Sequence, residues 1–564
     1  MRDDLGLTLL WIIPLIGMIL VLLIPKRAER SIKIVSLAAT LATFILSLVI
    51  TGAYINDLHT GGPGAQSLTK RAAANTLEVN PTTGLLLRAN PDGDFITRQT
   101  WIPYFNIQYF LGVDGISLSL VVLTGLVSVL ACLASWNINT QVKGYFALFL
   151  LLVTSMTGVF LALDLFLFYV FFEIMLLPMY FLIAVWGGAN REYAAIKFLL
   201  YTLLGSVFIL VAILLLYFWT PVSGGAQYSF DAIKLAQVAA SGFYSTDIQR
   251  IIFLLFLVGF LVKLPGFPFH TWLPDAHVEA PTPISMILAG ILLKIGGYGL
   301  IRMAWPLAPL GAQQMAYFVA ALGVFSILYG ALAAMAQTDF KRLVAYSSVS
   351  HMGYVTLGLA VMNLAGDGRY YAYGVAGAMF MMIAHGITST GMFFLVGVIY
   401  DRTHNRDLNT MGGLFASMPG YGAVSFLIFF GSMGLPGLCG FIAEVFVVLA
   451  AFHYDYLLGI LTATAVVLTA GYILWTLQRV FLGSNERYRG LPDLSAREWA
   501  ISIPLVALTI GLGILPQTLI LNWVGPSVSQ MVQTVASARK PADPKTVAQV
   551  VVPPAVLSER SAQQ

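Results

Sequence analysis

Charged side chains are scarce in this sequence. Among its 564 residues only 10% are Asp, Glu, Lys or Arg, whereas 58% are hydrophobic. A soluble globular chain carries roughly 25% charged residues, and disordered chains are poor in hydrophobic ones. The composition therefore excludes a soluble multidomain protein and a disordered one. It indicates a protein that crosses a membrane many times.

Cysteine is almost absent as well, and this excludes several kinds of chemistry. Cys132 and Cys439 lie far apart, each within an apolar run. Zinc and iron–sulfur sites need clustered ligands, so these two residues cannot form one. No G-x-G-x-x-G turn follows a strand, and no P-loop is present. The net charge is +4 and the sequence contains no long run of basic residues, which argues against a nucleic-acid partner. Any redox or nucleotide chemistry that drives this protein therefore belongs to another chain.

Long apolar runs are what the chain does have. A helix needs roughly 20 apolar residues to cross a bilayer. About fourteen such runs lie near 7–25, 32–54, 115–136, 144–163, 165–187, 193–219, 250–273, 283–304, 315–337, 342–361, 373–400, 420–452, 457–481 and 499–521. Strands of a membrane barrel would be about 10 residues long and would alternate in polarity. The sequence therefore predicts an all-α polytopic membrane protein with about 14 transmembrane helices.

The positions of the basic residues predict the orientation. Lys26, Arg27, Arg30 and Lys33 follow the first run, and the leading MRDDLG lacks the basic excess of a cleaved signal. Basic residues gather on the cytoplasmic side, which places the N-terminus outside. With an even number of spans, both termini are expected to be extracytoplasmic.

The tripeptide Leu-Pro-Gly occurs twice, at 264–266 and at 435–437, each time inside an apolar run. Proline removes a backbone donor and glycine lets the chain turn, so each copy predicts a broken transmembrane helix. The breaks fall in the fourth helix of two five-helix units, 144–304 and 315–481. Five is odd, so consecutive units have opposite topology, which is typical of inverted-repeat transporters. The alternative is a chance match in a chain rich in Leu and Gly.

The segments outside the two units complete the expected organisation. We expect two transmembrane helices in 1–54, an extracytoplasmic loop or insertion in 55–107, a third transmembrane helix in 108–143, the last one in 482–521 and a polar C-terminal tail in 522–564. The 55–107 loop is rich in Gly, Pro, Asn and Thr, and we assign it no role. The tail has no further apolar run, and we expect it to be mobile.

A few ionisable residues interrupt the predicted spans. They come from six helices: Glu173, Lys263, Lys294, His351, His385 and Glu444. Four of them stand nine to twelve residues from the start of a span, which is roughly 14 to 18 Å deep at 1.5 Å per residue. A charge at that depth costs at least a few kcal/mol. A row of acid, base and imidazole in the membrane plane favours proton hopping, whereas a solute pocket would need a local cluster.

Structural explanations compete with this one. A lone Glu or Lys can form a structural ion pair, and a buried neutral His can bond a carbonyl group. Haem would need facing His pairs on adjacent helices, for which the spacing gives no sign. Lys197 is a tentative member of the row, since it lies near a span end and can snorkel. Asp114, Asp164 and Asp339 stand at span ends and are expected to cap helices.

The segment after the first break is unusually polar. It carries four prolines together with His270, Asp275, His277 and Glu279. His270 and His277 are seven residues apart on broken backbone, which is weak spacing for a metal site, and we predict no metal. A hydrated proton-entry route from the cytoplasm is the more economical interpretation.

Several of these segments resemble a known family. KLPGFPFHTWLPDAHVEAPTPIS at 263–285 and LLKIGGYGLIR at 292–302 are similar to the signature of the antiporter-like subunits of respiratory complex I. SSVSHMG at 347–353, MMIAHG at 381–386 and GLPGLCGFIAE at 434–444 fit the same family. Within it the chain resembles the bacterial M type, because Glu444 stands where the L and N types have Lys. It also lacks the long lateral helix of the L type.

The resemblance implies a role for each residue of the row. Glu173 and Lys263 would form the ion pair of a first half-channel. Lys294 would be the central relay, His351 and His385 would continue it, and Glu444 would be the terminal site toward the outside.

The resemblance also implies the setting of the chain. It would be a subunit of an H⁺-translocating NADH–quinone oxidoreductase in a bacterial inner membrane, with no redox centre of its own. NADH, FMN, iron–sulfur clusters and quinone would be bound by partner subunits. Its membrane neighbours would be L- and N-type antiporter-like subunits and small membrane subunits.

Two other functions remain open at the level of sequence. A subunit of a multi-subunit Na⁺/H⁺ antiporter of the Mrp type shares the same motifs but consumes the proton gradient. A small-solute secondary transporter is disfavoured by the planar arrangement of the charges.

Overall fold

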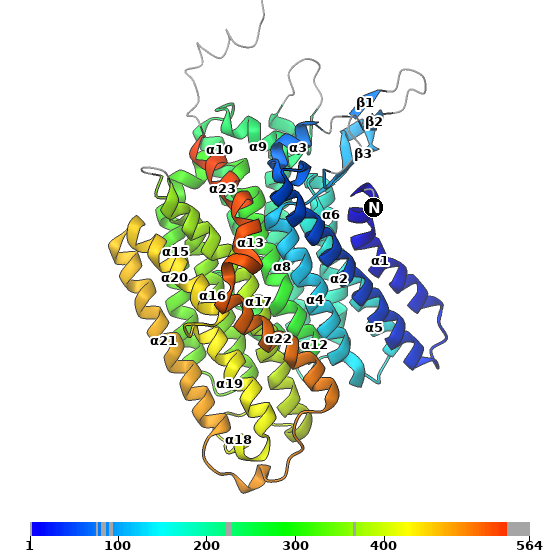
Figure 1. Ribbon diagram of the computed structural model, residues 1–564, viewed down its shortest axis with the longest axis vertical. Helices are drawn as coiled ribbons and strands as arrows, with labels where there is room; N and C mark the ends of the chain where they lie inside the picture. Colours follow the sequence, from blue (N-terminus) through cyan, green and yellow to red (C-terminus); the bar gives the residue numbers. More distant parts are fainter. Residues whose placement is uncertain are drawn as a thin grey trace, which may run out of the picture.

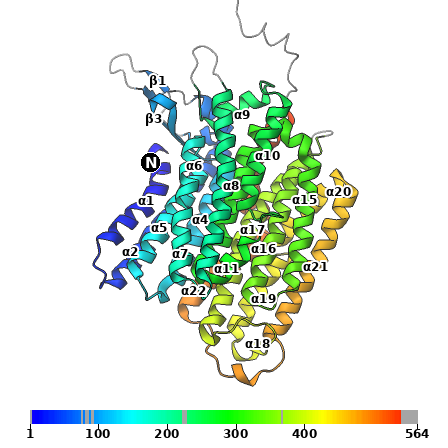
Figure 2. The same cartoon turned by 180° about the vertical axis from the view of Figure 1, so that it is seen from behind.

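The computed structural model describes residues 3–74, 77–79, 86–88, 94–220, 228–364 and 368–538. These residues form a bundle of long helices that lie side by side (Figures 1 and 2). The N-terminal helices lie at one edge of the bundle, and α20 and α21 lie at the other. Small strands and short helices gather at the end that is uppermost in both views.

The helices are α1 Asp3–Leu23, α2 Glu29–Thr60, α3 Leu68–Ala74, α4 Gly115–Ala134, α5 Val142–Leu161, α6 Leu165–Ile174, α7 Leu176–Trp186, α8 Arg191–Trp219, α9 Ala232–Ala240, α10 Thr246–Lys263, α11 Trp272–Glu279, α12 Thr282–Ile287, α13 Leu293–Gly299, α14 Trp305–Leu307, α15 Pro309–Met335, α16 Phe340–Ala360, α17 Arg369–Thr403, α18 Leu414–Ser417, α19 Pro419–Met433, α20 Cys439–Tyr454, α21 Tyr456–Phe481, α22 Ala496–Ile514 and α23 Asn522–Ala536. The strands are β1 Leu77–Val79, β2 Leu86–Arg88, β3 Ile96–Ile102 and β4 Ile107–Gly112, paired antiparallel as β1–β2 and β3–β4.

Eleven helices of the described residues are long and apolar enough to cross a membrane, and they coincide with eleven of the predicted runs. The three other runs lie on the broken pair α10 and α11, on α16, and on the broken pair α19 and α20. The mostly helical, many-span fold class is therefore confirmed, while the count of fourteen stays a prediction.

Burial separates a central pair of helices from the rest. In α17, and in the continuous helix from Thr282 to Leu307, every residue of the most apolar window is buried. In α1, α2 and α22 only about a third of that window is buried. Apolar side chains such as Leu204 and Val467 point outward, as a lipid or subunit contact requires. The central helices carry two residues of the predicted row, Lys294 and His385.

Both Leu-Pro-Gly segments break their helices, as predicted. The first helix stops at Lys263, and α11 resumes at Trp272. The second stops at Met433, and α20 resumes at Cys439. Gly434 and Gly437 have φ angles of +79° and +90°, a region that residues with a Cβ rarely adopt. Each break frees backbone groups at membrane depth, where they become available to side chains.

Each of the two predicted units contains an isolated backbone bridge between two aspartates. Asp164 and Asp231 form an isolated antiparallel bridge, and Asp339 and Asp407 form another. Helix α9 follows the first bridge at the upper end of the bundle, and α18 follows the second bridge toward the lower end (Figure 1). Two units of opposite orientation would produce this arrangement, and it supports the inverted repeat, which stays a prediction.

Helix caps account for the acidic residues at the span ends. Asp114 caps α4 in a capping box with Ser117, while Asp164 and Asp339 cap α6 and α16 through backbone N–H groups. An acceptor at this position satisfies donors that the first helical turn leaves free. The predicted caps are confirmed.

The structure corrects two expectations for the flanking segments. The 55–107 segment is not a plain loop: it contains α3 and the strands β1, β2 and β3, and β3 pairs with β4, which begins at the end of the segment. Ile96 of β3 and Phe110 of β4 are fully buried. In the tail, residues 522–536 form α23, which packs on α4 and α17. Its apolar side chains lie on one face, so no continuous apolar run announced it. The tail beyond residue 538 lies outside the described residues.

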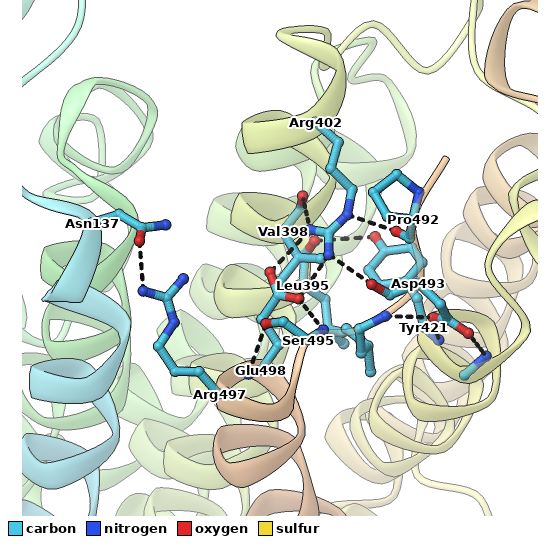
Figure 3. A network of polar contacts seen from close by, with 12 residues as sticks. Asn137, Leu395, Val398, Arg402, Tyr421, Pro492, Asp493, Ser495, Arg497 and Glu498 are labelled. Atoms are coloured by element: carbon cyan, nitrogen blue, oxygen red, sulfur yellow. Dashed lines mark hydrogen bonds and ion pairs between the residues drawn. The ribbon is translucent and has the colours of Figure 1, made fainter. Parts of the chain in front are cut away.

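A polar clamp joins the last turn of α17 to the first turn of α22 (Figure 3). The Arg402 guanidinium donates to both carboxylate oxygens of Glu498, at 2.7 and 3.0 Å. It also donates to the carbonyl oxygens of Val398, Pro492 and Asp493. The bidentate pair is nearly buried, with side-chain exposures of 13% for Arg402 and 8% for Glu498. The clamp therefore fixes the end of the helix that carries His385.

Asp493 extends this clamp to α19. Its carboxylate accepts backbone N–H groups of Gly420, Tyr421 and Leu494 (Figure 3). Burial pushes the pKa of this carboxyl upward, but the three N–H donors and the Arg402 charge outweigh it and hold the pKa below its usual value. An ionised carboxylate at the start of α19 also complements the helix dipole.

We expect Arg402→Ala to destabilise the subunit by about 2 kcal/mol, because it leaves the nearly buried Glu498 carboxylate without its partner. The loss is measured as a lower half-inactivation temperature of the purified assembly. Arg489→Ala is the matched control, since the Arg489–Glu486 pair is 80% and 83% exposed. An unchanged temperature for Arg402→Ala would mean that the clamp adds nothing to stability.

Candidate functional site

The centre of the predicted row is a buried Lys–His contact. The Lys294 ammonium donates to the carbonyl oxygen of Ala289 and lies 2.7 Å from Nδ1 of His385. Lysine has no acceptor, so Nδ1 accepts and the ring proton of a neutral His385 is on Nε2. That Nε2 has no hydrogen-bond partner among the described residues. One donor site of the pair is therefore free to pass a proton onward.

Glycines that follow Lys294 in the chain bring α13 close to the first helix break. A Cβ at Gly296 would meet the backbone N of Leu264 at 2.6 Å, and one at Gly299 would meet the ring of Phe260 at 2.1 Å. Only hydrogen fits at these two positions. The glycine-rich stretch of α13 therefore allows this helix to pack closely against the end of α10.

His351 continues the row on α16. Its ring centroid lies 5.4 Å from that of His385. Its Nδ1 is 2.8 Å from the carbonyl oxygen of Ser347, and its Nε2 is 2.9 Å from the carbonyl oxygen of Ser432. Carbonyl oxygens only accept, so both contacts are satisfied together when the ring carries two protons. A neutral His351 satisfies one of these contacts, so the ring can take up a second proton at this place in the row.

Glu444 ends the row at the second helix break. Its Oε1 lies 3.9 Å from Nε2 of His351 and has no hydrogen-bond partner among the described residues. Its side chain is 4% exposed. The carboxylate sits against Gly434, where a Cβ would come within 2.4 Å of Oε2. The break thus provides both a carbonyl group for His351, through Ser432, and the space for the acid.

Four predicted side chains therefore form one continuous contact path. It runs from Lys294 through His385 and His351 to Glu444, on helices α13, α17, α16 and α20. All four side chains are buried. Three bases followed by a carboxylic acid, at such distances, can exchange a proton directly or through one water. Their placement matches the predicted row, and their roles stay predictions.

Glu173 and Lys263 are near each other but are not joined. The Glu173 charge acts on Lys263. The Lys263 ammonium and one Glu173 oxygen nevertheless lack hydrogen-bond partners in the part of the chain that the structure describes. Glu173 is the penultimate residue of α6 and is half-buried, whereas Lys263 is 1% exposed. The ion pair that the resemblance implies is open in this structure.

Lys197 is paired rather than free at the span end. Its ammonium lies 2.7 Å from Asp275, which also contacts Arg342 at 3.3 Å. Asp275 belongs to α11, the helix that follows the first break. Lys197 thus links α8 to α11 through an ion pair with Asp275, so it does more than extend its ammonium group to the membrane surface.

We expect Lys197→Ala to lower proton transport by about threefold without abolishing it, because Arg342 still holds Asp275 and the pair is partly solvated. The check is the initial rate of transport in sealed vesicles. Lys234→Ala, at an exposed position of α9, is the control. A wild-type rate for Lys197→Ala would assign Lys197 a structural position only.

Comparisons with known proteins show the family to which the chain belongs. Residues 162–469 match the family model described as NADH:quinone oxidoreductase/Mrp antiporter, and residues 95–163 match NADH-ubiquinone oxidoreductase chain 4, amino terminus. NADH-quinone oxidoreductase subunit M of Rhodobacter capsulatus is 39% identical over 90% of this chain and 97% of its own length. The chain belongs to the NADH:quinone oxidoreductase/Mrp antiporter membrane family.

Solved structures of this family share the fold. A chain of respiratory complex I from Thermus thermophilus with bound NADH aligns with a TM-score of 0.76 and 27% identity, over 94% of this chain and 99% of its own. A chain of the Mrp complex from Dietzia sp. aligns with a TM-score of 0.72 over 97% of this chain and 100% of its own. The latter is only 19% identical and therefore shows the fold alone.

Sequence reasoning missed several groups around the predicted row. The carbonyl oxygens of Ser347 and Ser432 hold His351, and they are backbone atoms that no residue type announces. The Tyr354 and Tyr472 side chains interact with Glu444 electrostatically. Both tyrosines lie in predicted spans, where a polar hydroxyl group is unusual and could have marked them as candidates in the sequence.

The polar segment after the first break does not form a metal cluster. His270 and His277 are buried, and none of their ring nitrogens has a hydrogen-bond partner among the described residues. His277 is stacked on Phe393 with ring centroids 4.2 Å apart. No group of three or more His, Cys, Asp or Glu residues gathers with metal-binding geometry anywhere in the described ranges.

Proposed function

We propose that this chain is the proton-translocating antiporter-like subunit in the membrane arm of an NADH–quinone oxidoreductase. The observation that carries the proposal is the buried contact path from Lys294 to Glu444, which ends at the second helix break. The 39% identity of this chain to NADH-quinone oxidoreductase subunit M of Rhodobacter capsulatus, over 90% of the chain, supports the same assignment.

The path supports a simple order of proton steps. Lys294 gives a proton to Nδ1 of His385, and His385 then releases its Nε2 proton toward His351. His351 passes a proton to Glu444, which releases it toward the outside. Each step moves one proton between groups that are within direct or single-water reach. Because every group is buried, a change in a neighbouring charge alters its proton affinity strongly.

The Glu173–Lys263 pair, which precedes this path, provides such a neighbouring charge. When Glu173 approaches Lys263, the pair is neutral overall, and when Glu173 withdraws, Lys263 presents an uncompensated positive charge to Lys294. That charge favours the loss of a proton from Lys294 toward His385. Electron transfer from NADH to quinone in other subunits would drive the opening and closing of the pair.

The chemistry of the row favours protons over sodium ions. Lys294, His385 and His351 are bases that carry protons, and in their charged forms they repel a metal cation. Na⁺ requires several oxygen ligands in one place, whereas the oxygen groups here lie one at a time along the row. A Na⁺/H⁺ antiporter role is therefore the weaker candidate.

The proposal also includes the setting of the subunit. We expect both termini outside a bacterial inner membrane, with L- and N-type antiporter-like subunits and small membrane subunits as neighbours. NADH, FMN, iron–sulfur clusters and quinone would be bound by other subunits. The two five-helix units 144–304 and 315–481 would carry the two halves of the path.

The deciding experiment is a gentle purification through a tag on this chain, followed by absorption spectra before and after adding NADH. We expect flavin and iron–sulfur bands that bleach with NADH, and NADH-driven proton uptake after reconstitution into liposomes. A featureless spectrum with only small membrane chains attached would refute the proposal and favour the cation/proton antiporter.

A further inference from the structure

The Lys263 ammonium is buried without a hydrogen bond. It is 1% exposed, and no polar group of the described residues bonds to it. A buried charge with no compensation is very unfavourable, so its surroundings should contain some other source of stabilisation. The nearest such source is aromatic. The ammonium lies 5.2 Å from the ring centroid of Phe172 and 5.6 Å from that of Phe198.

These two rings face the ammonium from different helices. Phe172 belongs to α6 and Phe198 to α8, and both are fully or almost fully buried. The face of an aromatic ring is the negative side of its quadrupole, and a cation within about 6 Å of the centroid is attracted to it. The attraction is strongest where water is excluded, as it is here. The ammonium therefore occupies a small aromatic cage instead of a hydrogen-bonded site.

Other rings hold the cage in place. Phe260 packs against Phe172 at 79° with centroids 6.4 Å apart, and Trp272 packs against Phe198 at 63° and 5.3 Å. The indole N–H of Trp272 donates to the carbonyl oxygen of Val262 at 2.9 Å. Val262 immediately precedes Lys263, so this bond fixes the cage relative to the end of α10. Edge-to-face pairs of this kind are energetically favourable and restrict ring rotation.

The cage is linked to Glu173 through the chain itself. Phe172 directly precedes Glu173, and α6 ends one residue later, at Ile174. The Glu173 carboxylate is within hydrogen-bonding reach of the Tyr169 hydroxyl, one turn earlier on the same helix. Each member of the expected ion pair therefore has an alternative partner: Tyr169 for Glu173, and the two rings for Lys263.

We propose that Phe172 and Phe198 are positioning residues that form a resting site for the Lys263 ammonium when the Glu173–Lys263 pair is open. The inference rests on the proposed function, because it describes one position of the charge that drives the row. The rings keep Lys263 charged and oriented while Glu173 is withdrawn. Without them the open state is less populated, and proton transfer from Lys294 is triggered less often.

Packing alone would place rings here too, and a matched site separates the two explanations. Phe253 lies earlier on α10, is fully buried and packs against Trp305 at 72° and 5.0 Å. Its environment resembles that of Phe198 against Trp272, but no lysine or arginine of the described residues lies over its ring. A change that weakens only the ring quadrupole should therefore matter at Phe198 and not at Phe253.

The test uses the intact complex, reconstituted into liposomes, with NADH-driven proton uptake as the readout. Phenylalanine at 198 is replaced in turn by its 4-fluoro, 3,5-difluoro and 3,4,5-trifluoro analogues, which keep the ring shape and weaken its negative face. We expect the logarithm of the rate to fall with each fluorine, to a loss of about threefold for the trifluoro ring. The same series at 253 should leave the rate unchanged. Phe198→Leu should lose at least as much as the trifluoro ring.

Each contrary result has its own meaning. A flat series at 198, in a complex whose transport is lost on Lys263→Ala, would overturn the cage while keeping the proposed function. Equal losses at 198 and 253 would also overturn it, since they report packing. A wild-type complex without NADH-driven uptake would refute the proposed function, and the inference with it.

Discussion

Lys294→Met is expected to abolish proton translocation while the complex still assembles. Methionine keeps the length and packing of the lysine stem but carries no proton. The path then loses the group that, among the described residues, contacts Nδ1 of His385, at 2.7 Å. Transfer by a positioned acid or base typically contributes at least about a hundredfold to a rate, so we expect the transport rate to fall by about a hundredfold or more, to background.

The measurement is NADH-driven acidification of liposomes that contain the purified complex, together with NADH oxidation in detergent. Lys234→Met is the control, because this lysine is exposed on α9, at the upper end of the bundle (Figure 1). Normal subunit content with lost acidification would assign Lys294 to the relay. If acidification continued at the wild-type rate, the Lys294–His385 contact would be structural, and the path would begin elsewhere.

The membrane itself explains why so much of this site could be predicted from sequence. A charged or imidazole side chain in an apolar run is costly, so Glu173, Lys294, His351, His385 and Glu444 stood out against their surroundings. The helix breaks were equally visible, since proline and glycine have direct backbone consequences. In a soluble protein the same residue types would have been lost among many others.

Backbone and aromatic contributions could not be predicted in this way. The Ser347 and Ser432 carbonyl groups that hold His351 depend on where two helices meet, and no residue type marks that meeting. The rings of Phe172 and Phe198 are equally inconspicuous, because aromatic residues make up 13% of the chain. Which of them approach Lys263 is decided by helix packing.

Ion pairs between residues far apart in the chain could not be predicted from the sequence either. Lys197 resembled a residue that snorkels from a span end, yet it contacts Asp275, 78 residues away. Helix α23 escaped prediction for a related reason. Its buried residues, among them Trp523 and Val528, lie on one face only, so their mean hydropathy is too low to suggest a span.

Gly434→Ala is expected to cause the second large loss. Two effects combine at this position. Its φ of +79° is unfavourable for alanine by about 1 kcal/mol. The new Cβ would also stand 2.4 Å from Oε2 of Glu444, so the carboxylate has to move. Because Oε1 lies only 3.9 Å from His351, we expect that movement to interrupt the last step and to lower proton transport about tenfold.

Gly437→Ala separates strain from displacement. Gly437 lies in the same break at φ +90°, but nothing lies within 4 Å of the position of its Cβ. Both variants should therefore show a similar loss of thermal stability, while Gly434→Ala alone should lose transport. Adding Glu444→Asp to Gly434→Ala shortens the acid and relieves the contact, so partial recovery of transport would assign the defect to the carboxylate. Equal transport in the two glycine variants would instead mean that the break acts through its backbone, and that the seat of Glu444 on Gly434 has no part in proton release.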